Sequence, residues 1–318
     1  MVNRQTMETI GITGGTGFVG SALTDLLLKK GYRVVIYSRT PRSDRDDSKV
    51  LYSQWDPARE QIDYSYLPEL DGIVHMAGAS VQKRWTQQHK EDILRSRVQG
   101  TRFLVEQLQQ HARQCRVFIA SSAVGYYGPD HESGIPFREE DPPATDFLAN
   151  VCRLWEEASA DLGDQIRRVI LRFGIVFGRD EGAFPRLVQP LRFGAMPIPG
   201  NGRQIMSWIH IQDLCRMIVW CLEQQKIAGV FNAVAPEPAS QRKILETISR
   251  HKKGLKLPLY VPETALRLLL GEMSGEILKS SNVDAKKMLA TGFRFDYPTL
   301  SDAIAELMTS RNAYHEKA

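Results

Sequence analysis

Residues 9–20 read Thr-Ile-Gly-Ile-Thr-Gly-Gly-Thr-Gly-Phe-Val-Gly, and this stretch decides the expected fold. The apolar and β-branched residues at its start predict a short buried strand, and the leucine-rich segment 21–30 predicts a helix that packs on a sheet. A second apolar stretch, 32–37, follows Gly31. Strand, glycine turn, helix and strand within about 30 residues form one βαβ unit, which favours a parallel sheet with right-handed crossovers.

The same alternation continues along the chain. Apolar strands are expected at 72–76, 116–120 and 168–172, and they are separated by helix-like stretches at 88–111 and 149–162. This order predicts an α/β fold with a doubly wound parallel sheet of the Rossmann type. Proline and glycine become frequent between residues 185 and 202. We therefore expect a dinucleotide-binding domain over 1–178 and a smaller, mixed substrate domain over 179–318, with a strand near 228–236 returning to the sheet.

Composition excludes several classes of protein. The 318 residues include 25% charged and 42% hydrophobic residues, with a net charge of only +4, which argues against disorder and against binding to nucleic acid or a membrane surface. The four cysteines have no CxxC spacing, which argues against a disulfide framework or a zinc site. No apolar run approaches the ~18 residues of a membrane span, and the start of the chain lacks an apolar signal core. These features predict a cytoplasmic monomer or homodimer without metal that acts on a small molecule.

The glycines of the loop are spaced as GxxGxxG, and each has a physical role. Gly14 permits the sharp turn out of the strand, Gly17 lets the backbone approach a pyrophosphate, and Gly20 lets the helix pack closely on the sheet. A pyrophosphate would then lie at the helix N-terminus, where free N–H groups and the helix dipole favour an anion. The alternative is a tight turn without a ligand, but the strand before and the helix after the loop favour dinucleotide binding.

The end of the second strand indicates which dinucleotide is bound. An NAD site usually places Asp or Glu about 20 residues past the loop to hold the ribose hydroxyls. This sequence instead has Ser38-Arg39-Thr40-Pro41-Arg42. Since a guanidinium can pair bidentately with a 2′-phosphate, Arg39 favours NADP over NAD, with Ser38 or Arg42 as further contacts. The alternative is a solvated loop arginine.

Three motifs together resemble the short-chain dehydrogenase/reductase superfamily: the glycine loop 14–20, Ala77-Gly78-Ala79 after one strand, and Ser121-Ser122 after another. Gly-Asn-Gly at 200–202 and Trp-Ile-His-Ile-Gln-Asp at 208–213 are similar to its extended branch. Four further segments, 83–85, 122–128, 152–156 and the tail from 271, resemble an NAD(P)-dependent epimerase/dehydratase-like subfamily with its own short C-terminal domain. The cofactor-binding residues implied by loop and resemblance are Thr13, Gly14, Gly17, Phe18, Val19, Gly20, Ser38, Arg39, Ala77, Gly78 and Ser121.

The resemblance implies a catalytic Ser, Tyr and Lys, but only the serine, Ser122, is present. Leu148 and Cys152 stand where the Tyr and Lys of a YxxxK motif would lie, and no YxxxK occurs between 120 and 165. Tyr126 or Tyr127 is the candidate for a rearranged proton donor. The alternative is that one of these tyrosines packs under the nicotinamide and the other lies in the core.

Further candidates complete the predicted site. Arg97 stands where the family places a helix Asn, and it could supply the missing cation. Arg84 and Trp85 could hold an anionic or planar substrate, or lie in a solvated loop; Trp55 and Asp56 could flank the adenine or lie in a surface loop.

Two functions follow from these residues. The first is an NADP-binding oxidoreductase or epimerase-like protein that transfers a hydride to or from a small carbonyl or hydroxyl compound. The second is a non-catalytic, NADP-dependent redox sensor, for which the missing Tyr–Lys pair is the main support. A scaffold with a vestigial glycine loop ranks below both.

Overall fold

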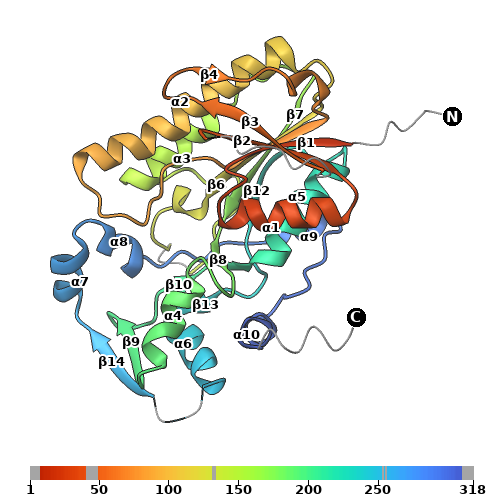
Figure 1. The fold of residues 1–318 in the computed structure, drawn as a ribbon. Coiled ribbons are helices and arrows are strands. Elements are labelled where there is room, and N and C mark those ends of the chain that lie inside the picture. Colours follow the sequence, from red (N-terminus) through yellow and green to blue (C-terminus); the bar gives the residue numbers. More distant parts are fainter. Residues whose placement is uncertain (1–7, 41–48, 131–133, 253, 255, 310–318) are drawn as a thin grey trace. The chain divides into compact units, whose positions relative to one another are not determined.

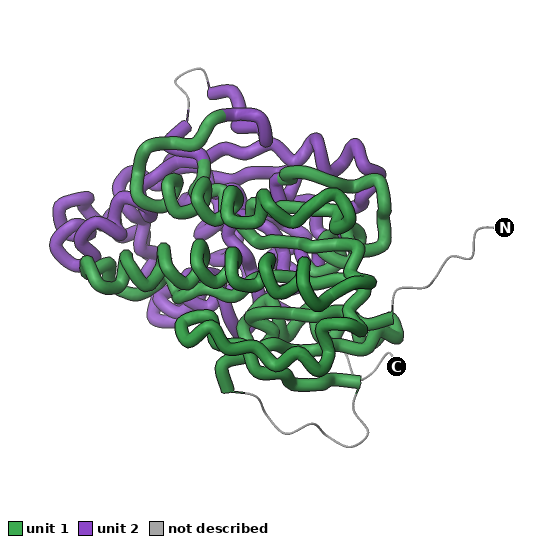
Figure 2. The backbone as a smooth tube through the Cα atoms, turned by 90° about the horizontal axis from the view of Figure 1, so that it is seen from above, with its two compact units in different colours: residues 1–126, 142–172, 215–231 green, residues 127–141, 173–214, 232–318 purple. Residues whose placement is uncertain are grey.

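The computed structural model describes residues 8–40, 49–130, 134–252, 254 and 256–309, and its helices and strands are labelled in Figure 1. The chain forms two compact units that are not contiguous in sequence (Figure 2). The first unit comprises residues 1–126, 142–172 and 215–231, and the second comprises residues 127–141, 173–214 and 232–318. The predicted domain boundary near residue 178 stays a prediction.

An eight-stranded sheet forms the centre of the first unit, in the order β12-β7-β6-β5-β1-β2-β3-β4. The pairs of β1 with β2, β1 with β5, β2 with β3, and β5 with β6 are parallel, while β3 and β4 are antiparallel. The predicted parallel α/β fold is therefore confirmed, with an antiparallel strand at one edge. The strands are β1 (Thr9–Thr13), β2 (Arg33–Ser38), β3 (Val50–Asp56), β4 (Gln61–Ile62), β5 (Gly72–His75), β6 (Val117–Ala123), β7 (Arg167–Phe173) and β12 (Gly229–Ala233).

Helices connect these strands, and their ends follow local sequence signals. The main helices are α1 (Phe18–Lys29), α2 (Gln87–His111), α3 (Phe147–Glu157) and α5 (Ile211–Glu223). Thr86 and Asp146 cap α2 and α3, because their side chains accept hydrogen bonds from the N–H groups of His89 and Ala149. Two short 3₁₀ helices, η1 (Leu67–Glu69) and η2 (Val124–Tyr126), precede β5 and follow β6.

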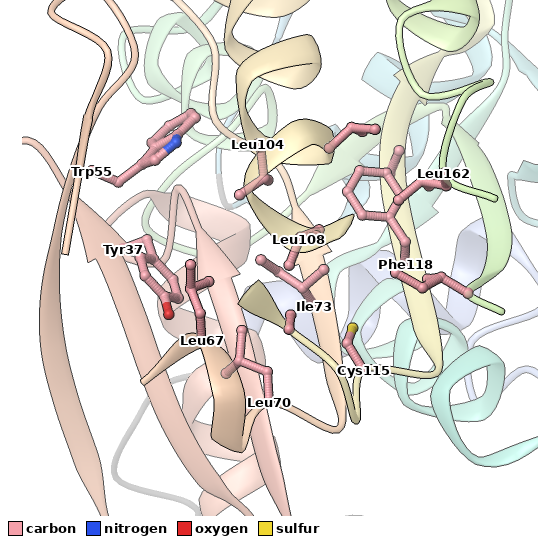
Figure 3. Close-up of a cluster of buried hydrophobic side chains, with 14 of the residues drawn as sticks. Tyr37, Trp55, Leu67, Leu70, Ile73, Leu104, Leu108, Cys115, Phe118 and Leu162 are labelled. Carbon is pink, nitrogen blue, oxygen red and sulfur yellow. The ribbon is translucent and has the colours of Figure 1, made fainter. Parts of the chain in front are cut away.

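One apolar cluster of the first unit lies between the sheet and α2. All five residues of β1 are buried, as expected for a central strand with both faces covered. Figure 3 shows side chains from the sheet meeting leucines of α2. The labelled residues of this cluster are Tyr37, Trp55, Leu67, Leu70, Ile73, Leu104, Leu108, Cys115, Phe118 and Leu162.

The second unit contains short paired strands and small helices. β8 (Ile175–Phe177) pairs with β11 (Trp208–His210) and β9 (Ala195–Pro199) with β14 (Leu257–Val261), both in parallel, while β10 (Ile205–Met206) pairs with β13 (Ala239–Ser240) antiparallel. Phe177 stacks on Trp208 with ring centroids 5.6 Å apart, and both belong to an apolar core of the second unit. Its helices are α4 (Phe184–Leu191), α6 (Gln241–Arg250), α7 (Glu263–Leu270), α8 (Met273–Leu278), α9 (Lys286–Ala290) and α10 (Leu300–Met308).

Two absences hold for the described ranges. Each helix there is too short or too polar to cross a lipid bilayer. The same part of the chain has no cluster of three or more His, Cys, Asp or Glu side chains suited to a metal ion.

Candidate functional site

The glycine loop joins the end of β1 to the start of α1, and its backbone is tightly packed. Gly14 has a φ of +75°, in the left-handed region that favours glycine. The N–H of Gly17 donates to the carbonyl oxygen of Gly14 at 3.0 Å, which closes the turn. A Cβ on Gly20 would lie only 2.2 Å from the same oxygen. The loop therefore needs glycine at Gly14 for its backbone conformation and at Gly20 for the close approach of the helix.

A cavity of about 650 Å³ opens beside this loop, within the first unit. Its walls come from the ends of β1, β2, β3 and β5 and from one face of α2, which is the carboxyl edge where ligands bind in open α/β sheets. The lining residues are Gly14, Thr16, Gly17, Tyr37, Ser38, Arg39, Trp55, Asp56, Pro57, Ala58, Met76, Ala77, Gly78, Ala79, Asp92, Arg95, Ser96, Gln99 and Gly100.

The predicted cofactor residues divide into two groups around this cavity. Those in its wall are Gly14, Gly17, Ser38, Arg39, Ala77 and Gly78, while Thr13, Phe18, Val19, Gly20 and Ser121 lie outside the wall. Trp55 and Asp56 also line the cavity rather than a remote surface loop. Arg39 is exposed, and Ser38 donates to the carbonyl oxygen of Thr40 at 2.9 Å. Arg42 lies outside the described residues.

Four polar residues of α2 line the cavity although no sequence motif singled them out: Asp92, Arg95, Ser96 and Gln99. Relative to Asp92, the other three stand three, four and seven residues further along, which places the four on one face of the helix. That spacing indicates a shared face, but only the fold shows that this face borders the cavity.

Thr13 lies outside the cavity wall and belongs to a buried chain of hydrogen bonds. Its hydroxyl lies 2.6 Å from Nδ1 of His75, and Nε2 of His75 lies 2.9 Å from the hydroxyl of Thr101. The His75 ring is completely buried, and this burial, with a smaller effect of the nearby Arg97 charge, lowers its pKa to about 3. His75 is therefore a neutral link between β1, β5 and α2.

Arg97 holds the loop that follows β5. Its Nη1 donates to the carbonyl oxygen of Ala79 at 2.9 Å, and its guanidinium lies over the ring of Trp155 at 4.9 Å. A Cβ on Gly78 would lie 2.9 Å from Cζ of Arg97, so Gly78 allows the loop to rest on the guanidinium. Burial lowers the pKa of the guanidinium, while the neighbouring Cys152 acts in the opposite direction. Arg97 thus places a cation directly under the 77–79 loop.

Ser122 belongs to a buried network at the end of β6. Its hydroxyl donates to Oε1 of Glu156 at 2.7 Å. Arg172 forms a bidentate ion pair with the same carboxylate, with Nε 2.8 Å from Oε1 and Nη2 2.8 Å from Oε2. Cζ of Arg172 also lies 3.4 Å from the ring centroid of Tyr126. One carboxylate and one guanidinium therefore connect Ser122 to Tyr126 inside the first unit.

Sequence reasoning missed Glu156 and Arg172 as members of the site. Arg172 follows the apolar residues 169–171 of β7 and is itself buried, and a charged side chain directly after such an apolar run is the signal that was available. Glu156 follows the Cys152 position by one helical turn, and its partner Arg172 lies 16 residues further along the chain. The contact itself depends on how α3 packs against the sheet.

Tyr126 and Tyr127 have different surroundings although they are adjacent in sequence. Tyr126 is half-buried, and its burial raises the pKa of the phenol while Arg172 acts in the opposite direction. Tyr127 belongs to the second unit, is fully buried, and donates to Oδ1 of Asn232 at 2.7 Å. Its ring stacks on Phe137 with centroids 5.0 Å apart. The Tyr127 hydroxyl is therefore engaged within the core of its own unit.

Cys152, at the position of the missing lysine, is buried. Burial, assisted by Glu156 and opposed by Arg97, raises the pKa of its thiol to about 11. The thiol is therefore protonated at neutral pH, as expected for a small buried side chain rather than for a nucleophile.

Trp85 and Arg84 lie outside the cavity wall. The indole N–H of Trp85 donates to the carbonyl oxygen of Val81 at 3.0 Å, and its ring meets Phe147 edge to face at 5.3 Å. Nζ of Lys90 lies 5.1 Å from the centroid of the Phe147 ring. Arg84, which precedes Trp85 in the sequence, is exposed. One cation, Lys90, therefore lies at this aromatic contact.

The fold and the cavity define a Rossmann-type protein with a glycine loop at its ligand edge. Residues 10–261 match the NAD dependent epimerase/dehydratase family, and residues 261–307 match a domain of unknown function, DUF1731. The epimerase family protein YfhF of Bacillus subtilis is 37% identical over 308 residues, which are 95% of this chain and 98% of that protein. The chain therefore belongs to the NAD-dependent epimerase/dehydratase family.

Solved structures agree with this assignment. The human epimerase family protein SDR39U1, crystallised with NADPH, is 28% identical with a TM-score of 0.84, over 94% of this chain and 99% of that chain. A nucleoside-diphosphate sugar epimerase from Corynebacterium glutamicum is 30% identical with a TM-score of 0.74, over 98% of this chain and 61% of that chain. The resemblance to an extended short-chain dehydrogenase/reductase with a short C-terminal domain is thereby confirmed.

Proposed function

We propose that this protein binds NADP and acts as an oxidoreductase or epimerase-like enzyme on a small carbonyl or hydroxyl compound. The observation that carries the proposal is the cavity between the glycine loop and Arg39. The human relative crystallised with NADPH supports the same cofactor. When bound, the cofactor supplies or accepts a hydride at its nicotinamide ring.

The residues of the cavity suit a phosphorylated dinucleotide. The N-terminus of α1 at Gly17 would hold the pyrophosphate, since its N–H groups and dipole favour an anion. Arg39 and Ser38, at the end of β2, would hold the 2′-phosphate. Trp55 and Asp56 would flank the adenine. No carboxylate stands at the end of β2 to bind free ribose hydroxyls, which favours NADP over NAD.

The chemical step would fall to the network at the end of β6. Ser122 would hold the reacting oxygen of the substrate, and Tyr126 would move the proton, with the guanidinium of Arg172 beside its ring opposing the rise in pKa that burial causes. Arg97 would supply the positive charge that the missing lysine does not. We leave Tyr127 out of this set, because its hydroxyl is bonded to Asn232 within the second unit. Arg84 and Trp85 would contact an anionic or planar substrate.

The second candidate function is an NADP-dependent redox sensor without catalysis. The absence of YxxxK between residues 120 and 165 favours it. A sensor would bind the cofactor with an affinity similar to that of an enzyme. It would communicate the redox state of the bound cofactor to a partner.

Calorimetric titration with NADPH and NADH tests the cofactor. We expect NADPH to bind more tightly, and Arg39→Ala to weaken NADPH about 10- to 100-fold while leaving NADH unchanged, because one charge-assisted contact of about 1.5–3 kcal/mol is lost. Arg113→Ala is the matched control, since this exposed arginine of the same unit lies outside the cavity. Equal affinity for both cofactors, or tighter NADH, would refute the assignment of Arg39.

A panel of small carbonyl compounds with NADPH separates enzyme from sensor. An enzyme oxidises NADPH with at least one of them, and Ser122→Ala removes this turnover without changing the dissociation constant for NADPH. A sensor gives no oxidation with any member of the panel and binds a partner differently in its NADP and NADPH forms.

A further inference from the structure

The proton of the Ser122 hydroxyl is directed into the protein. A serine hydroxyl has one proton to donate and two lone pairs with which to accept. The contact between Oγ of Ser122 and Oε1 of Glu156, at 2.7 Å, joins this proton to a carboxylate. A hydrogen bond to an ionised acceptor is roughly twice as strong as one between neutral groups. Ser122 therefore has only lone pairs left for any other partner.

Arg172 fixes the carboxylate in this role. Its guanidinium donates to both oxygens of Glu156, so that the carboxylate cannot rotate away from Ser122 without losing a bidentate pair. Both side chains are buried, with Arg172 exposed by 2% and Glu156 by 9%, which keeps water from competing for the carboxylate. The orientation of the Ser122 proton is thus imposed by two residues behind it.

Cys152 also interacts with the Ser122 hydroxyl. Its thiol is neutral and buried, and sulfur in a thiol is a weak acceptor. The Ser122 hydroxyl therefore donates to the carboxylate of Glu156 and not to the sulfur of Cys152.

We propose that Glu156 is a positioning residue that makes Ser122 a hydrogen-bond acceptor toward the substrate, so that Ser122 recognises a hydroxyl proton and not a carbonyl oxygen. This inference rests on the proposed function, because it takes Ser122 to face the substrate. Ser122 would accept a hydrogen bond from the hydroxyl of the substrate in its alcohol form. The donor to a carbonyl oxygen would then be Tyr126. The site would therefore bind the alcohol form more tightly than the carbonyl form.

Neutron diffraction from crystals of the perdeuterated wild-type protein tests the orientation directly. We expect the deuteron of the Ser122 hydroxyl to lie on the line to Oε1 of Glu156. A deuteron that points to Cys152, or out of the network, would overturn the inference. The neutron measurement requires neither bound cofactor nor turnover. The orientation of the Ser122 proton is therefore tested independently of the proposed function, which the titrations and the carbonyl panel test.

A kinetic measurement tests the consequence for any alcohol and carbonyl pair that the panel identifies. Glu156→Gln should raise KM for the alcohol about tenfold, because one ordinary hydrogen bond to the substrate is lost. It should leave KM for the carbonyl unchanged. Glu157→Gln is the matched control, because this neighbouring glutamate on α3 is exposed and pairs with Arg153. Equal increases in both directions would show a merely structural role for Glu156 and overturn the inference.

Discussion

Replacing Gly20 by alanine tests whether the glycine loop works by close packing. The added Cβ would lie 2.2 Å from the carbonyl oxygen of Gly14 and 2.6 Å from Cα of Gly15. Both contacts are to backbone atoms, so no side-chain rotation can relieve them. The loop and α1 must therefore move apart by about 1 Å before ordinary contact distances are restored.

The expected cost follows from this displacement. Overpacking a well-packed region costs about 1–3 kcal/mol of unfolding free energy, which urea unfolding measures. The displaced loop also carries the N–H groups proposed to hold the pyrophosphate. We therefore expect Gly20→Ala to lose at least tenfold in NADPH affinity by calorimetric titration, which corresponds to about 1.4 kcal/mol.

Gly17→Ala separates packing from binding. A Cβ on Gly17 would have one close neighbour, the carbonyl oxygen of Gly14 at 3.3 Å, so we expect nearly wild-type stability. The methyl group would stand on the exposed side of the loop, where the pyrophosphate is proposed to lie, and would weaken NADPH. Gly275→Ala is the control, because nothing lies within 4 Å of its Cβ position. Wild-type stability of Gly20→Ala, or wild-type NADPH affinity of Gly17→Ala, would refute this reasoning.

Two further predictions concern the core. Ile73→Ala, at a position that is 0% exposed, should lower the unfolding free energy by about 2–5 kcal/mol in urea, whereas Leu268→Ala, 83% exposed, should change it by less than about 0.5 kcal/mol. Burial lowers the pKa of His75 to about 3, below its value of 6.5 in the unfolded chain. The unfolded state therefore binds one more proton between these two pH values. The free energy of unfolding should fall as the pH drops from about 6.5 toward 3. His75→Gln should remove a slope approaching 1.4 kcal/mol per pH unit, measured by urea unfolding between about pH 7 and pH 5; an equal slope in both proteins would contradict the assignment.

Local patterns were sufficient to predict most strands of the central sheet. The apolar stretches at 72–76, 116–120 and 168–172 correspond to β5, β6 and β7 within a residue or a few residues at their ends. These predictions succeeded because a strand covered on both faces requires a continuous apolar sequence. The glycine spacing at 14–20 likewise follows from backbone conformation and close approach, which depend on neighbouring residues.

The site was less predictable where it depends on distant contacts. Tyr126 and Tyr127 are the same residue type in adjacent positions, and the sequence offered no means to distinguish them. In the structure Tyr126 lies under the guanidinium of Arg172, whereas Tyr127 is bonded to Asn232, 105 residues away. Such differences arise from packing between segments that are far apart along the chain.

The sequence by itself determined the parallel α/β fold, the glycine loop and the departure from YxxxK, because each is a property of residues close together in the chain. Only the tertiary structure decided which polar groups share the end of β6. Ser122, Glu156 and Arg172 come from a strand, a helix and another strand, and they meet because α3 packs over the sheet and buries their charges together. A buried charge must find a partner, and the identity of that partner is fixed by the fold rather than by local spacing.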